Sequence, residues 1–93
     1  MLTPESRDLL QSVYDDLAQY DPYPETASID DQDAWMRREE GESALAGLIN
    51  TALAPGSVDR QTLNETRALV EREGIRADPD QVAAVLHVLA QLT

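Results

Sequence analysis

The sequence contains no cysteine, and its only histidine is His87. Without cysteine the chain can form neither disulfides nor thiolate metal sites, and it has no cysteine nucleophile. A single histidine excludes multi-histidine metal sites, and no acidic residue stands one helical turn from His87 to orient it as a catalytic base. The chain also has no glycine-rich phosphate loop and no dinucleotide-binding motif. We therefore expect a protein that is not an enzyme and that has no metal or cofactor.

Long apolar runs and positive charge are also scarce. No apolar run approaches the roughly 18 residues that a membrane span requires, and the N-terminus lacks the basic and apolar segments of a secretory signal. Eighteen acidic residues stand against seven arginines, and there is no lysine, so the net charge is −11. This charge repels nucleic acid and anionic membranes and favours either plain solubility or a basic protein partner. We expect a soluble, cytoplasmic protein.

Helix start and stop signals divide the chain into about four helices. Thr3, placed before a proline, starts the first helix, and the Asp-Pro pair at 21–22 ends it. Asp59 and Asp78 are the corresponding start signals for the last two helices. No strand-like alternation and no internal repeat is present. The predicted fold class is therefore all-α, with a single acidic domain over residues 1–93 and a small bundle of helices at approximately 4–20, 31–53, 60–73 and 79–92.

Two helix boundaries depend on glycines. Gly41 lies in a polar stretch, so residues 31–53 form either one helix through this glycine or a turn followed by a shorter helix; we favour one helix, which starts near Asp31 with Ser28 or Asp30 as its cap. Gly74 is typical of a helix that ends with a glycine in the left-handed conformation, with Ile75 folding back onto the helix.

The N-terminal third combines acidic and aromatic residues. Residues 1–36 contain nine acids and one arginine, a net charge of −8, whereas residues 37–93 contain nine acids and six arginines, a net charge of −3. All four aromatic residues lie in the first of these segments. Aromatic anchors surrounded by carboxylates suit a surface that docks a basic partner. The predicted partner-binding residues are Asp16, Tyr20, Asp21, Tyr23, Asp30, Asp31, Asp33 and Trp35.

A structural interpretation of the same segment stays open. The aromatic rings can cover an aliphatic core, while the aspartates near residue 30 cap the second helix and interact with its dipole. Runs of charge are most often solvated surface.

The leading functional hypothesis is a non-catalytic, acidic regulatory module that binds a basic protein surface. An inhibitor that fills a nucleic-acid-binding groove by presenting phosphate-like carboxylates is one specific form of it. The alternative is a homodimeric structural or accessory subunit, because the C-terminal helix is apolar on nearly every side. In that helix Val82, Val85, Leu86 and Leu89 are expected in the core, and Ala84, His87 and Val88 are the expected dimer interface.

Overall fold

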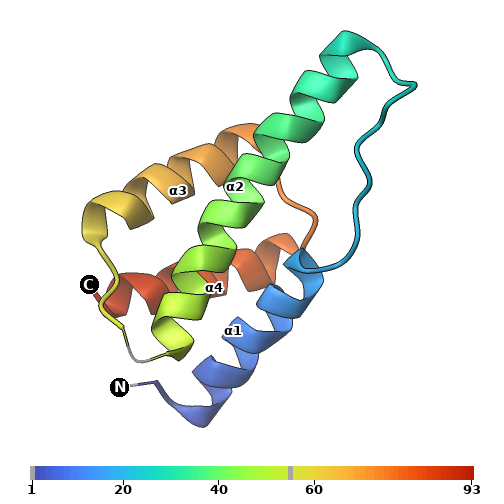
Figure 1. Cartoon of the computed structure of the whole chain (residues 1–93). Coiled ribbons are helices and arrows are strands. Elements are labelled where there is room, and N and C mark those ends of the chain that lie inside the picture. The colour runs from blue at the N-terminus through green and yellow to red at the C-terminus, as the bar shows by residue number, and fades with distance from the viewer. Residues whose placement is uncertain (1, 55) are drawn as a thin grey trace.

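The computed structural model describes residues 2–54 and 56–93. Within these residues the chain forms four helices and no strands (Figure 1). The all-α class predicted from the sequence is confirmed. The helices are α1 (Pro4–Leu17), α2 (Ile29–Leu53), α3 (Arg60–Glu73) and α4 (Pro79–Gln91).

Side-chain caps set the starts of all four helices. The side chains of Thr3 and Asp59 accept hydrogen bonds from backbone N–H groups of the first turns of α1 and α3, as predicted. Asp78 does the same for α4. The hydroxyl of Ser28 accepts from the Asp31 N–H at 3.2 Å, so Ser28 caps α2, which starts two residues earlier than predicted. These contacts satisfy N–H groups that a helix leaves without a partner.

The end of α1 differs from the prediction. The helix stops at Leu17 and not at Tyr20, which lies in the connecting segment. The carbonyl oxygens of Leu17 and Gln19 instead accept hydrogen bonds from the guanidinium of Arg76, at 3.4 and 3.3 Å. Helix-terminal carbonyls need such a partner, and a distant arginine supplies it here.

The long helix α2 passes through Gly41 without interruption, so the predicted single helix is confirmed. Gly41 is buried, and a Cβ atom there would lie 3.4 Å from Cγ of Leu69 on α3. Gly41 thus lies at the contact between α2 and α3. Neither α2 nor any other helix in the described residues combines the length and apolar character needed to cross a membrane.

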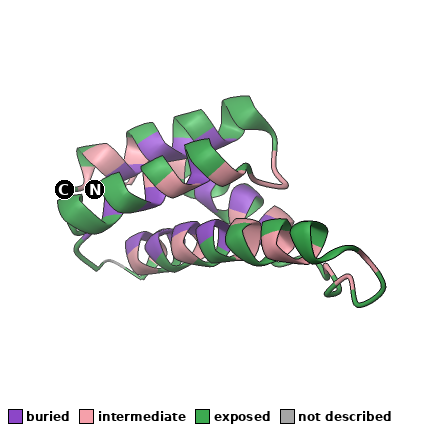
Figure 2. Ribbon diagram, turned by 90° about the horizontal axis from the view of Figure 1, so that it is seen from above, coloured by how far each residue is buried: buried purple, intermediate pink, exposed green. Residues whose placement is uncertain are grey.

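An aliphatic core lies between the helices, and buried positions face one another across it (Figure 2). All four α4 residues expected in the core are buried. The fully buried large side chains are Leu10, Val13, Leu45, Ile49, Leu63, Val85 and Leu89. This core holds the C-terminal part of α2, whereas the first turns of α2 and the segment before it project beyond the other helices (Figure 1). We call residues 20–36 the acidic arm.

The last turn of α3 ends at Gly74, as predicted, but in a different conformation. Gly74 has φ 82° and ψ 176°, whereas the left-handed helical conformation has ψ near about +47°. Its N–H still donates to the carbonyl of Val70 at 2.9 Å, and Ile75 is half-buried against the core. A positive φ combined with an extended ψ is essentially restricted to glycine.

A pair of glycine substitutions tests this backbone. Gly74→Ala should lower the free energy of unfolding by about 2 kcal/mol, because it places a Cβ in a conformation that only glycine tolerates. Gly47→Ala is the matched control: Gly47 lies in α2, and nothing stands within 4 Å of the added Cβ. It should raise stability by about 0.5–1 kcal/mol, since alanine favours helix. Urea unfolding measures both, and equal effects of the two substitutions would contradict the assigned conformation.

Candidate protein-docking site

Large apolar side chains are exposed in one region of the molecule, the acidic arm. Within the described residues, the exposed ones are Tyr20, Tyr23, Ile29 and Met36, and the exposed fractions of Tyr20 and Ile29 reach 89% and 75%. No arginine occurs between residues 20 and 36. The region that the sequence marks as acidic and aromatic is therefore also where the folded protein leaves apolar surface in water.

Contacts with α2 hold the connecting segment of the arm. The rings of Tyr23 and Trp35 meet edge to face, with centroids 5.2 Å apart and an interplanar angle of 79°. The side-chain amide of Gln32 donates to the carbonyls of Pro24 and Glu25, at 3.2 and 3.1 Å. Trp35 is half-buried, and its indole N–H is buried without a hydrogen-bond partner. The half-buried ring of Trp35 thus packs against Tyr23, while Tyr20 and Tyr23 remain exposed.

The predicted partner-binding aspartates fall into two groups. Asp30 and Asp31 are exposed and Asp33 is half-buried, and in the described part of the chain the carboxylates of these three residues form no ion pair. Asp16 is half-buried in the last turn of α1. Asp21 differs, because its carboxylate contacts the guanidinium of Arg38 and lies 3.4 Å from Nε of Arg76. Its charge is therefore already engaged within the protein.

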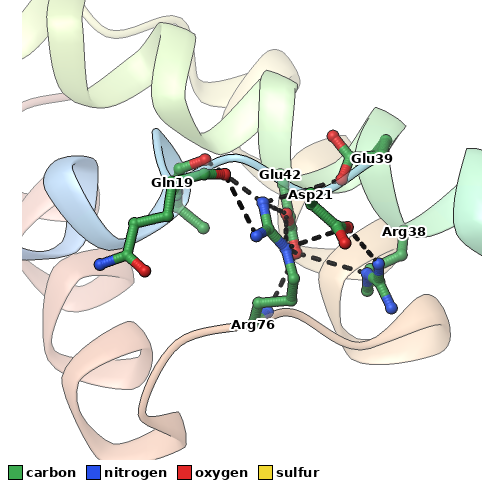
Figure 3. Close-up of polar contacts among 7 residues, drawn as sticks. Gln19, Asp21, Arg38, Glu39, Glu42 and Arg76 are labelled. Carbon is green, nitrogen blue, oxygen red and sulfur yellow. Dashed lines mark hydrogen bonds and ion pairs between the residues drawn. The ribbon is translucent and has the colours of Figure 1, made fainter. Parts of the chain in front are cut away.

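Asp21 belongs to an ion-pair network centred on Arg76 and Glu42 (Figure 3). The carboxylate of Glu42 is 2% exposed and accepts hydrogen bonds from Nε of Arg76 at 2.8 Å and from the backbone N–H of Arg76 at 3.0 Å. Nη2 of Arg76 lies 2.7 Å from the same carboxylate. Because Arg76 also binds the carbonyls at the end of α1, one side chain from the α3–α4 connection joins α1, α2 and the start of the arm.

The network contains three carboxylates and two guanidinium groups. The third carboxylate belongs to Glu39, whose Oε1 lies 3.7 Å from Nη2 of Arg76. Burial, a hydrogen bond with Asp21 and the charge of Glu42 raise the pKa of Glu39. Partial burial acts to raise the pKa of Asp21 as well, but hydrogen bonds with Glu39 and Arg38 and the charges of both arginines outweigh it, so that this pKa is lowered. The same cluster of charges thus shifts the pKa values of these two carboxyl groups in opposite directions.

Sequence reasoning missed the Glu42–Arg76 pair. Glu42 stands three and seven residues before Leu45 and Ile49, which places an acid on the buried face of α2. An acid at this position indicates that a cation from a distant part of the sequence lies close to it in the fold, because a buried carboxylate needs a partner. The sequence alone does not show which of seven arginines supplies it.

The residues predicted for a dimer interface lie on the outer side of α4. Ala84 and His87 are exposed, whereas Val88 is half-buried and packs against the core. Nε2 of His87 is 3.2 Å from the side-chain amide nitrogen of Gln91. None of these three residues is among the exposed large apolar side chains of the described residues.

Compared with models of protein families, with curated protein sequences and with solved structures, the chain matches none of them.

Two conservative substitutions in the network should differ in their effect on stability. Glu42→Gln should lower the free energy of unfolding by about 2 kcal/mol, because it breaks the ion pair with Arg76. The loss is smaller than for a fully buried ion pair, since Arg76 is partly exposed and still has Asp21 as a partner. Glu39→Gln should leave stability at neutral pH unchanged or higher, because it removes a carboxylate whose ionisation the folded state disfavours.

The pH dependence of stability provides the control for these two substitutions. The folded protein holds the Glu39 proton more tightly than the unfolded chain does, so stability falls as the pH rises from the ordinary value of 4.5 through the raised pKa. Glu39→Gln should abolish this fall. Asp21 acts in a separate and lower window: its contribution is present above 3.8 and is lost as the pH falls through its lowered pKa. Urea unfolding across pH measures both, and a Glu39→Gln protein as unstable as Glu42→Gln at neutral pH would contradict the raised pKa of Glu39.

Proposed function

We propose that the protein is a non-catalytic interaction module that binds a basic surface of a partner protein through the acidic arm. One observation carries the proposal: the exposed large apolar side chains of the described residues lie in the same segment as a run of acids with no arginine between them. Isolated exposed apolar residues are common on proteins, but their concentration on one projecting segment is typical of an interaction site.

The two kinds of side chain serve different steps of binding. Exposed carboxylates attract a basic surface over a distance of about 8 Å at physiological salt, which speeds encounter. Apolar and aromatic side chains then lose water against the partner and slow dissociation. Tyr20, Tyr23, Ile29 and Met36 are available for the second step, and Asp30, Asp31 and Asp33 for the first.

A regulator that occupies a nucleic-acid-binding groove is the more specific form of this proposal. Its support is the net charge of −11, since a groove that binds phosphates also attracts clustered carboxylates. The homodimer through α4 has weaker support, because Ala84 and His87 expose little apolar surface to a second copy.

Removing charge from the arm should slow binding. The triple variant Asp30→Asn, Asp31→Asn and Asp33→Asn should associate with the partner about tenfold more slowly at low salt, and dissociation should change little. The reason is that the removed carboxylate charges act mainly on the rate of encounter with a basic surface. The partner is recovered by pull-down from the native cell, identified and purified, and association is then followed by biolayer interferometry at low and high salt.

The control removes the same number of charges elsewhere. Asp8→Asn, Glu71→Gln and Asp80→Asn lie outside the arm and should slow association far less. Thermal unfolding of both variants checks the fold, and light scattering checks for a dimer. Equal association rates for the arm variant and the unmodified protein would overturn the proposal.

A further inference from the structure

The outer face of α2 carries two exposed apolar side chains, Ile29 and Met36, that the sequence-based prediction did not include. Ile29 and Met36 are seven residues apart, so they lie two helical turns, or about 10.5 Å, apart on the same side of α2. Their exposed fractions are 75% and 50%. Both are large apolar side chains that the core does not use.

Acidic side chains alternate with these two along the stripe. Asp33 and Glu40 follow Ile29 and Met36 by four residues each, which places them on the same face. Neither carboxylate forms an ion pair within the described part of the chain. The nearby Arg37 is directed to α3, where its Nε lies 3.0 Å from the carboxylate of Glu73. The stripe therefore combines apolar side chains with two carboxylates that take no part in the ion pairs of the described residues.

Small residues and a hollow continue the stripe toward the middle of α2. Gly47 is exposed on the same face and has open space around it. A cavity of about 470 Å³ lies between α2 and α3, and its lining includes Ala44, Ala68 and Leu69. Glu40 and Glu65 line this cavity, and Arg72, which pairs with Glu73, lines it too. Small residues allow a second backbone to approach, and the cavity gives room for its side chains.

We propose that this outer face of α2, defined by Ile29, Asp33, Met36 and Glu40, binds a basic amphipathic helix of the partner protein. The inference rests on the proposed function of the acidic arm and names the partner's chemistry. Apolar side chains of the partner helix cover Ile29 and Met36, and its lysines or arginines pair with Asp33 and Glu40. Methionine suits such a surface because it is flexible and polarisable.

A helix fits this face better than other occupants. Anchors spaced by two turns along a straight stripe match the spacing of side chains on a facing helix. A second copy of the chain would bring the same carboxylates against each other, and like charges disfavour that pairing. The charge pattern thus selects a basic helix.

The test uses two synthetic peptides of equal positive charge as probes. One is an amphipathic lysine–leucine helix, and in the other every leucine is replaced by glutamine. The full chain is labelled at isoleucine and methionine methyl groups, which places probes at Ile29 and Met36 and controls at the buried Ile49 and at Ile75 near α4. We expect the amphipathic peptide to shift the Ile29 and Met36 signals while the two control isoleucines stay in place.

Variants measure the contribution of the stripe. Ile29→Ser combined with Met36→Ser should weaken binding of the amphipathic peptide at least about tenfold, because both anchors are lost. Ala83→Ser, at an exposed position on α4, should leave it nearly unchanged. The glutamine peptide should bind far more weakly than the amphipathic one.

The outcomes separate this inference from the proposed function. If both peptides bind equally and the double variant binds normally, the acidic arm binds basic partners but the helix inference is overturned. If neither peptide binds, the proposed function is overturned as well. If the Ile29 and Met36 signals shift with protein concentration alone, a second copy occupies the face and the inference is wrong.

Discussion

The buried pair of Glu42 and Arg76 is the interaction on which the arrangement of the helices and the arm depends. A carboxylate that is 2% exposed needs a cation, and Arg76 supplies its guanidinium and its backbone N–H. The same guanidinium binds the last carbonyls of α1 and lies beside Asp21. One arginine thus fixes where α1 ends, how the connecting segment leaves it, and where the α3–α4 connection lies against α2.

This constraint explains how an acidic, proline-containing segment can remain ordered at the surface. Such a segment buries too little apolar area to hold itself in place. Asp21 anchors its start through two arginines, Gln32 binds its backbone, and the ring of Trp35 packs against Tyr23. With the segment held at these points, the apolar side chains of the arm can remain exposed and available to a partner.

Local features of the fold could be predicted from the sequence, and features that join distant residues could not. The caps at Thr3, Asp59 and Asp78 were predictable because capping depends on neighbouring residues. The end of α1 was misjudged by three residues, and the carbonyls there accept hydrogen bonds from Arg76, a contact that no local signal in the sequence records. Asp21 shows the same limit for the site: its place in an acidic segment was evident, but its pairing with arginines depends on the tertiary fold. Ile29 and Met36 were missed because a helix stripe is meaningful only once the buried face of α2 is known.

The central claim is that the Glu42–Arg76 pair holds the acidic arm in place, and backbone ¹⁵N relaxation measures this directly. The comparison is between the unmodified protein and the double variant Glu42→Gln, Arg76→Gln, which removes both charges of the pair together. The account predicts a folded bundle in both proteins, with rigid amides at Tyr20, Asp21 and Tyr23 in the unmodified chain and fast motion of these amides in the double variant. Equal rigidity of the arm in the two proteins would contradict it.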